Sequence, residues 1–227
     1  MSLKLGLMGK RQTFWEFAPD MEDRVYFEDG EFVQVGPLKG AKNVEFHEQI
    51  GEQEVVYVPH EETRTLPQVF PELKKVEVRG CFPPKTMELV KFMNEYDLYR
   101  EETIEVDGKE LKPRDFLFSL LLDTPAAKET PVWAYGLNIQ VFGEYKGRPA
   151  KVTLKNSHPP MENWGGRSAY GKNVGIPLSI GVQMLANGEI DSLGVMPPEA
   201  VINPTDFFEE LSKRGIDIQE NFERYSR

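Results

Sequence analysis

Short runs in which apolar and polar residues alternate are separated along the chain by pairs of turn residues. In Arg24–Val35, two such runs flank the pair Asp29-Gly30. This pair suits the type I′ turn of a β-hairpin, because both residue types tolerate positive φ angles. The same pattern recurs at Thr103–Leu111 across Asp107-Gly108 and at Val132–Lys155 across Lys146-Gly147. The pattern therefore predicts three antiparallel hairpins, with further short strands at Val55–Val58 and Lys75–Val78.

Apolar residues at helical spacing occupy segments between these hairpins, and a proline precedes each segment. Proline fits the first turn of a helix, where its missing N–H has no partner to lose. We predict helices after Pro83-Pro84, after Pro113, from Leu178 to Asn187 behind Pro177, and after Asn203-Pro204. Gly188 is expected to end the third helix in a left-handed cap. Hairpins interleaved with helices are typical of an α+β fold, with a mixed, mostly antiparallel sheet and helices covering one face.

Charge and composition narrow the class of protein. Of the 227 residues, 27 are Lys or Arg and 37 are Asp or Glu, which gives a net charge of −10. With no basic run longer than Lys74-Lys75, this balance argues against a nucleic-acid surface. The longest apolar run, Phe116–Leu122, is too short to span a membrane, and no secretion signal is visible. We therefore expect a cytoplasmic protein with no membrane or nucleic-acid partner.

Candidate reactive side chains are few. One cysteine and three histidines exclude an internal disulfide and a structural zinc site, so no metal is expected. Cys81 lies near Arg79, which could lower a thiol pKa, but an inert packed thiol is the favoured interpretation. His158 is a candidate for proton transfer in a loop, although a surface role is favoured. His47 and His60 stand beside glutamates and are interpreted as surface residues.

Sequence fingerprints of common enzyme sites are missing. The chain has no G-x-G-x-x-G dinucleotide fingerprint after a strand, and no H-E-x-x-H, G-x-S-x-G or C-x-x-C motif. The most unusual stretch is Gly165–Pro177, where several glycines lie close to Arg167, Ser168, Lys172 and Asn173. Cations beside permissive backbone suit a carboxylate ligand. A flexible entry to the following helix is the alternative.

Stretches along most of the chain, in their order and spacing, resemble the C-terminal region of the saccharopine dehydrogenase (saccharopine reductase) family. The similar stretches are Tyr26–Gly30 with its Val-rich strand, Val76–Gly80 leading into Pro83-Pro84, Leu121–Pro125, Gly175–Gly188, Gly194–Glu199 and Phe207–Ile216. The resemblance extends from about Arg24 to Glu220.

This resemblance implies a fold and a division of the chain. The fold is expected to be similar to the C-terminal domain of glyceraldehyde-3-phosphate dehydrogenase (GAPDH C-terminal-domain-like). Residues 24–221 are expected to form the substrate domain, with 1–23 an N-terminal extension or linker and 222–227 a tail. Family members also carry an N-terminal Rossmann domain that binds NAD(P), and its fingerprint is absent from this sequence. The chain is therefore expected to be inactive alone, as a fragment, a split subunit or a stand-alone protein.

The function implied by the resemblance is oxidoreduction of the C–N bond of an amino-acid-derived amine by NAD(P). The expected roles of this chain are substrate binding and homodimerisation, with a small amino-acid substrate. The residues expected to hold that substrate are Arg79, Gly80, Arg167, Ser168, Lys172 and Asn173; no general acid or base is assigned. The alternatives are a related amine dehydrogenase, of the lysine 6-dehydrogenase or carboxynorspermidine dehydrogenase type, and a non-catalytic binding or assembly module.

Overall fold

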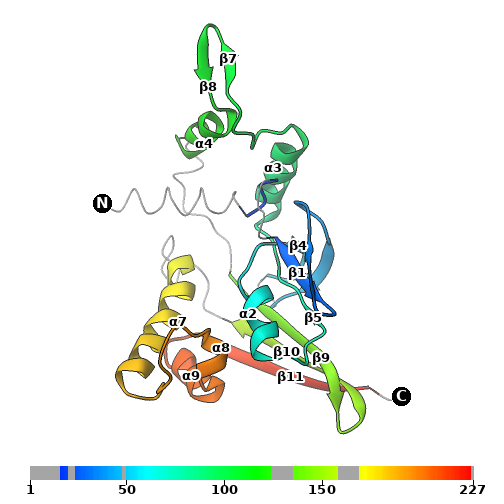
Figure 1. The fold of residues 1–227 in the computed structure, drawn as a ribbon, viewed down its shortest axis with the longest axis vertical. Helices are drawn as coiled ribbons and strands as arrows, with labels where there is room; N and C mark the ends of the chain where they lie inside the picture. Colours follow the sequence, from blue (N-terminus) through cyan, green and yellow to red (C-terminus); the bar gives the residue numbers. More distant parts are fainter. Residues whose placement is uncertain (1–15, 20–23, 48–49, 124–134, 158–168, 226–227) are drawn as a thin grey trace. The chain divides into compact units, whose positions relative to one another are not determined.

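The chain divides into two compact units. A computed structural model describes residues 16–19, 24–47, 50–123, 135–157 and 169–225. Unit 1 comprises Met1–Lys42 with Glu54–Glu129, and unit 2 comprises Asn43–Gln53 with Thr130–Arg227. The fold is α+β with antiparallel sheets, as predicted, and its strands are divided among several small sheets (Figure 1).

Two of the predicted hairpins lie in unit 1. Strand β1 (Val25–Glu28) pairs antiparallel with β2 (Glu31–Gln34) and with β5 (Lys75–Val76), and β7 (Ile104–Val106) pairs with β8 (Lys109–Leu111). Asp29 and Gly30 have φ angles of 48° and 94°, and Asp107 and Gly108 have 49° and 74°. Positive φ at both central residues is the requirement of the predicted turn type. A further sheet has the order β3-β4-β6, from β3 (Lys42–Glu45), β4 (Glu52–Tyr57) and β6 (Arg79–Gly80).

Helices of unit 1 pack against these strands through aliphatic and aromatic side chains. Helix α3 (Pro84–Glu95) has a proline at its start, as predicted, and buries Met87, Val90 and Met93. Met87 and Val90 pack with Val56 and Val58 in one core cluster. Helix α4 (Pro113–Asp123) also begins at the predicted proline, whereas α2 (Glu62–Val69), with Pro67 inside it, was not predicted.

The main sheet of unit 2 has two chemically different faces. Its order is β11-β10-β9, from β9 (Asn138–Tyr145), β10 (Arg148–Ser157) and β11 (Asp217–Arg224), all antiparallel. The register places Val141, Val152 and Phe222 in one row across the sheet. The neighbouring row, Gln140, Thr153 and Asn221, faces the other way because side chains alternate along a strand. One face is therefore mainly apolar and the other mainly polar.

Helices of unit 2 enclose a separate small core. Helix α7 (Ala169–Ala186) packs on α9 (Pro204–Ser212) through Ile180, Met184 and Leu211, with α8 (Pro198–Val201) between them in the chain. The predicted start of α7 at Pro177 was wrong, because the helix already begins at Ala169. Proline removes one backbone hydrogen bond there, and packing of the flanking turns tolerates the loss. Gly188 has φ 75°, which confirms the predicted left-handed cap.

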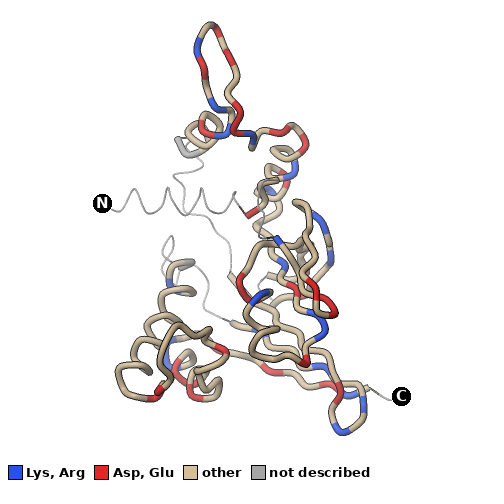
Figure 2. The backbone as a smooth tube through the Cα atoms, in the orientation of Figure 1, with Lys and Arg blue, Asp and Glu red and all other residues tan. Residues whose placement is uncertain are grey.

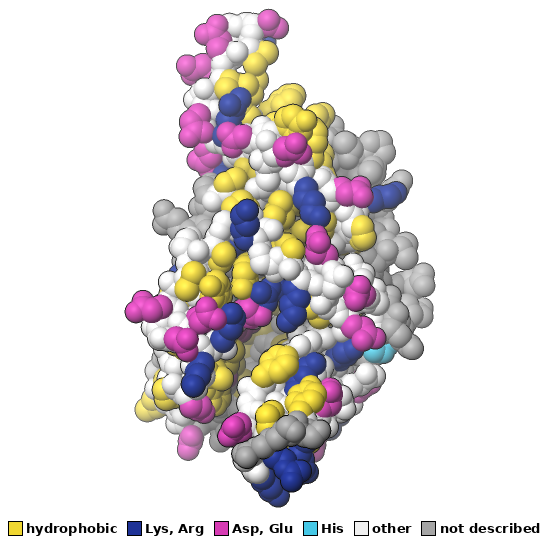
Figure 3. All heavy atoms as spheres, turned by 90° about the vertical axis from the view of Figure 1, so that its right-hand side faces the viewer, with side chains coloured by type: hydrophobic (Ala, Val, Ile, Leu, Met, Phe, Trp, Pro, Cys, Tyr) yellow, Lys and Arg dark blue, Asp and Glu magenta, His cyan; other side chains and the backbone are white. Residues whose placement is uncertain are grey.

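Charged residues of both signs are distributed along the described chain. Figure 2 shows Lys and Arg interspersed with Asp and Glu on both units. On the face presented in Figure 3, hydrophobic side chains are also exposed among the charged ones. Among the described residues, no helix is both long enough and apolar enough to cross a bilayer.

Candidate functional site

Arg79, one of the residues singled out from the sequence, is held in a fixed orientation in unit 1. It lies on β6 opposite Tyr57 of β4. Its Nε donates a hydrogen bond to the carbonyl oxygen of Gly40 at 2.9 Å, and its Nη1 donates to the carboxylate of Glu77. The guanidinium carbon lies 4.2 Å from the centroid of the Tyr57 ring, a cation–π distance. With 15% of its side chain exposed, Arg79 is oriented by contacts on several sides.

Aromatic and charged side chains extend this arrangement into one cluster. The Tyr57 ring stacks on Tyr26 with centroids 5.2 Å apart, and the Nζ of Lys75 lies 5.0 Å from the Tyr26 centroid. The Tyr57 hydroxyl donates to Glu77 at 3.2 Å. Burial opposes ionisation of Glu77, but hydrogen bonds and charge from Arg79, with the Tyr57 hydroxyl, hold the pKa of Glu77 below its usual value. Glu77 is therefore the counter-ion that keeps Arg79 in place.

One edge of the Arg79 guanidinium makes no contact with an acceptor in the described part of the chain. Its Nη2 has no acceptor among the residues that the structure describes, although Nε and Nη1 are both bonded. Gly80 follows in β6 and pairs with Val56, and a Cβ on Gly80 would meet the Val58 side chain at 3.4 Å. The neighbouring Cys81 is half-buried, and burial raises the pKa of its thiol. A raised thiol pKa favours the inert interpretation of this cysteine.

His60 is exposed, as interpreted from the sequence, and it forms a hydrogen-bonded pair with Glu62. Its Nδ1 lies 2.8 Å from Oε2 of Glu62, and its backbone oxygen accepts from the Thr63 hydroxyl at 2.7 Å. The hydrogen bond to Glu62 raises the pKa of His60, and burial, moderated by the charge of His60, raises the pKa of Glu16. The spacing of His60 and Glu62 was visible in the sequence, whereas nothing there places Glu16 near them. A histidine–carboxylate pair of this kind is suited to proton transfer.

The other predicted substrate residues belong to unit 2. Lys172 and Asn173 lie in the first turns of α7, the lysine exposed and the asparagine half-buried, and both interact with other groups of the protein. Arg167 and Ser168 lie outside the described residues, as does His158. Arg79 and Gly80 thus lie in one unit, and Lys172 and Asn173 in the other.

The described residues offer neither a metal site nor a dinucleotide site. Among the described side chains, no group of three or more His, Cys, Asp or Glu residues is placed to hold a metal ion. A dinucleotide is cradled by a glycine-rich turn in a parallel βαβ unit. This sequence has no such fingerprint, and every described strand pairing with a defined register is antiparallel. These residues therefore do not fit a dinucleotide.

Comparison with known protein families gives one match that covers most of the chain. The model of the saccharopine dehydrogenase C-terminal domain matches residues 18–216. The match confirms the resemblance inferred from the sequence motifs. It includes Arg79 and its partners Gly40, Tyr57 and Glu77, together with Lys172 and Asn173.

Proposed function

Because the chain belongs to the saccharopine dehydrogenase family, through its C-terminal domain, we propose that it binds the substrate of an oxidoreductase acting on C–N bonds. The family is one of oxidoreductases and is typically NAD(P)-dependent. The substrate is an amino-acid-derived secondary amine, and a separate domain supplies the nucleotide site. The geometry of Arg79 is the observation that carries this proposal.

Arg79 acts as the anchor for a substrate carboxylate. The Gly40 carbonyl, the Glu77 carboxylate and the Tyr57 ring hold the guanidinium before any ligand arrives. A pre-oriented arginine loses little side-chain entropy when it donates its remaining N–H groups to a carboxylate. Since Glu77 balances its charge, the anchor is stable without ligand, and a carboxylate needs only to meet the Nη2 edge.

Calorimetric titration of the purified chain with saccharopine and, separately, with NADH tests this function. We expect saccharopine to bind and NADH not to bind. Arg79→Gln should weaken saccharopine binding by at least about tenfold, the size of one charge-assisted hydrogen bond to a carboxylate. Arg100→Gln, which removes an exposed arginine of the same unit, is the matched control and should leave binding unchanged.

Other outcomes separate the alternatives. Binding of L-lysine but not saccharopine would identify a relative of the lysine 6-dehydrogenase type. Equal binding of saccharopine by the chain and by Arg79→Gln would refute the anchor role. If neither saccharopine nor L-lysine binds to the chain, with or without NADH, the non-catalytic assembly module is correct and the enzymatic proposal is wrong.

We further propose that a second copy of this chain covers the apolar face of the β11-β10-β9 sheet. Ile139, Val141, Tyr145 and Phe222 lie on that face and are 51%, 50%, 43% and 42% exposed. A contiguous exposed apolar face is typical of an interaction surface, and identical faces pair readily about a two-fold axis. This face supports the homodimer expected from the sequence.

Size-exclusion chromatography with light scattering tests the dimer. Val141→Lys should convert the dimer into a monomer, because it puts a charge into the covered face. Gln140→Lys, at the adjacent position on the opposite face, is the matched control and should remain dimeric. A chain that is monomeric at all concentrations would refute this part of the proposal.

A further inference from the structure

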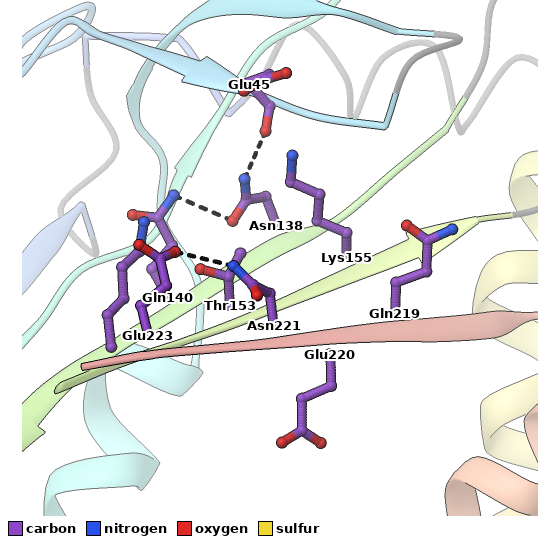
Figure 4. Close-up of a pocket in the computed structure, with 10 residues that line it drawn as sticks. Glu45, Asn138, Gln140, Thr153, Lys155, Gln219, Glu220, Asn221 and Glu223 are labelled. Atoms are coloured by element: carbon purple, nitrogen blue, oxygen red, sulfur yellow. Dashed lines mark hydrogen bonds between the residues drawn. The ribbon is translucent and has the colours of Figure 1, made fainter. Parts of the chain in front are cut away.

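The polar face of the β11-β10-β9 sheet in unit 2 forms a concavity that the proposed function does not use. It has a volume of about 460 Å³ and is lined by Glu45, Asn138, Gln140, Lys151, Thr153, Lys155, Gln219, Glu220, Asn221 and Glu223. Figure 4 shows the labelled side chains of β9, β10 and β11 on one side of the sheet, facing Glu45 of β3, except that of Glu220, which points to the opposite side of β11. Volumes of this order accommodate small ligands.

Thr153, in the floor of this concavity, carries a polar group that no described residue satisfies. Its side chain is in the middle of β10, and the residue is only 7% exposed. Its Oγ1 is buried and has no hydrogen-bond partner among the described residues. Buried hydroxyl groups almost always have a partner, because an unpaired one has lost its water without gaining a replacement. An additional molecule in the concavity would supply the partner once the long side chains above Thr153 shift.

The charges around Thr153 are balanced at both ends of the concavity. At one end Lys151 lies opposite Glu223 in the strand register. At the other end Lys155 donates to the Phe46 backbone oxygen at 3.3 Å, beside Glu45. Neither lysine makes an ion pair with any described residue. Each end of the concavity has one positive and one negative side chain, so a simple anion or cation would meet attraction and repulsion together. A zwitterion would gain nothing from binding in one orientation rather than the other.

Amide side chains fill the space between these charged ends. Asn138 donates to the Glu45 backbone oxygen at 2.7 Å, Gln140 donates to Asn138 at 3.2 Å, and Asn221 donates to Glu223 at 2.9 Å. Their other donor and acceptor atoms, and the side-chain amide of Gln219, have no hydrogen-bond partner among the residues that the structure describes. Amides both donate and accept hydrogen bonds, as do the hydroxyl groups of a polyol. We propose that this concavity is a binding site for an uncharged, polyhydroxylated small molecule of monosaccharide size.

An aromatic ring lies next to the lining residue Lys151, on the same face of the sheet as the concavity. Phe142 lies on the same face of β9, is 64% exposed, and has the Nζ of Lys151 5.5 Å from its centroid. The ring offers an apolar surface to the C–H groups of a pyranose, and the lysines and glutamates donate to and accept from its hydroxyls. This site lies within unit 2 and does not depend on the role of Arg79 in unit 1.

Protein-observed NMR of the full chain, titrated with D-glucose, myo-inositol, L-lysine and citrate, tests this proposal. We expect saturable shifts of the Gln140, Gln219 and Asn221 side-chain amides with a neutral polyol, at a dissociation constant near about 1 mM. Glu223→Gln and the isosteric Thr153→Val should each weaken this binding by at least about fivefold. Glu220→Gln, on the same strand but directed to the other face, is the matched control and should leave it unchanged.

The remaining outcomes overturn the proposal. Citrate or L-lysine saturating these amides while both polyols fail would mean that the site recognises charge. No saturable shift with either polyol up to about 10 mM would mean that water alone satisfies Thr153. If Thr153→Val fails to fold, the comparison of Glu223→Gln with Glu220→Gln, both exchanges at surface-accessible positions, still decides the question.

Discussion

Substitution of Gly40 tests whether the Arg79 cluster depends on a backbone shape that only glycine adopts easily. Gly40 has φ 70°, and its carbonyl oxygen accepts the 2.9 Å hydrogen bond from Nε of Arg79. A Cβ at this position would lie closer than 3.0 Å to both Cδ2 and Cε2 of Tyr57. That ring cannot easily move, because Tyr57 is buried, stacks on Tyr26 and lies under the Arg79 guanidinium.

The cost of Gly40→Ala has two parts. The left-handed backbone costs a non-glycine residue roughly 1–2 kcal/mol. Forcing a methyl group against a packed ring costs roughly another 1–3 kcal/mol. The expected loss in the free energy of unfolding is therefore about 2–5 kcal/mol. Gly108 has a similar φ of 74°, but a Cβ there would have no neighbouring atom within 4 Å, so Gly108→Ala should lose only roughly 1–2 kcal/mol.

Urea denaturation followed by far-ultraviolet circular dichroism measures both variants. Gly40→Ala should also weaken saccharopine binding, because the displaced Tyr57 ring and Gly40 carbonyl no longer orient Arg79. Gly108→Ala should bind like the unsubstituted chain. Equal losses of stability in the two variants would refute the steric reasoning, and full saccharopine binding by a destabilised Gly40→Ala would show that Arg79 does not need this support.

Further predictions concern a titrating pair, a core position and a helix cap. Folding raises the pKa of His60. The stabilisation of the folded state by His60 is therefore complete at pH values below the pKa of His60 in the unfolded chain, and it is lost as the pH rises through the pKa of His60 in the folded chain. An NMR titration of Glu62→Gln should show the His60 pKa falling, since its strongest contact is the 2.8 Å bond to Glu62. Leu211→Ala in the buried core of unit 2 should cost about 2–5 kcal/mol in urea denaturation, whereas Leu178→Ala on an exposed side of α7 should cost much less. Asn203→Ala, which removes the side-chain acceptor for Thr205 N–H at 3.0 Å, should cost about 1 kcal/mol by the same measurement, and no loss would show that this cap is dispensable.

The hairpins could be predicted from the sequence because their turns are determined locally. Two adjacent residues with positive φ set the direction of both strands, and Asp-Gly or Lys-Gly pairs adopt this geometry. The structure has positive φ at each predicted pair, including Lys146 and Gly147 with 53° and 73°. The helix starts at Pro84, Pro113 and Pro204 could also be predicted from local sequence, because each helix has a proline in its first turn.

Elements that depend on distant partners were not predicted. Strand β11 has the sequence Asp-Ile-Gln-Glu-Asn-Phe-Glu-Arg, in which most residues are charged or amides, so apolar and polar residues do not alternate clearly. It forms because it pairs with β10 from Ser157 to Ala150, and it extends through Phe222 to Arg224. Of helix α7, the part from Leu178 was predicted and the part from Ala169 to Pro177 was not. The helix passes through glycines and Pro177, since burial of Ile180 and Met184 against α9 outweighs poor local propensity.

The same holds for the candidate sites: what depends on nearby sequence could be predicted, and what depends on strand pairing could not. Arg79 could be selected by residue type and by its place in the stretch Val76–Gly80 of the family resemblance, whereas its contacts with Gly40 and Tyr57 could not be predicted. The concavity around Thr153 could not be predicted, because its lining requires the register of β9 and β11 on either side of β10. No single stretch of sequence contains more than part of that lining.

The contacts of Arg79 explain why an arginine occupies this position. Its planar guanidinium stacks on Tyr57 while its edges donate to Gly40 and Glu77 in different directions. A lysine ammonium has no planar group to stack on Tyr57 and no rigid, planar set of N–H donors, so lysine at this position could not make all of these contacts. Only Glu77 is close in sequence; Gly40 and Tyr57 are brought to Arg79 by the pairing of β4 with β6 and by the turn before β3. The orientation of this side chain, on which carboxylate binding depends, is therefore a product of the whole local fold of unit 1.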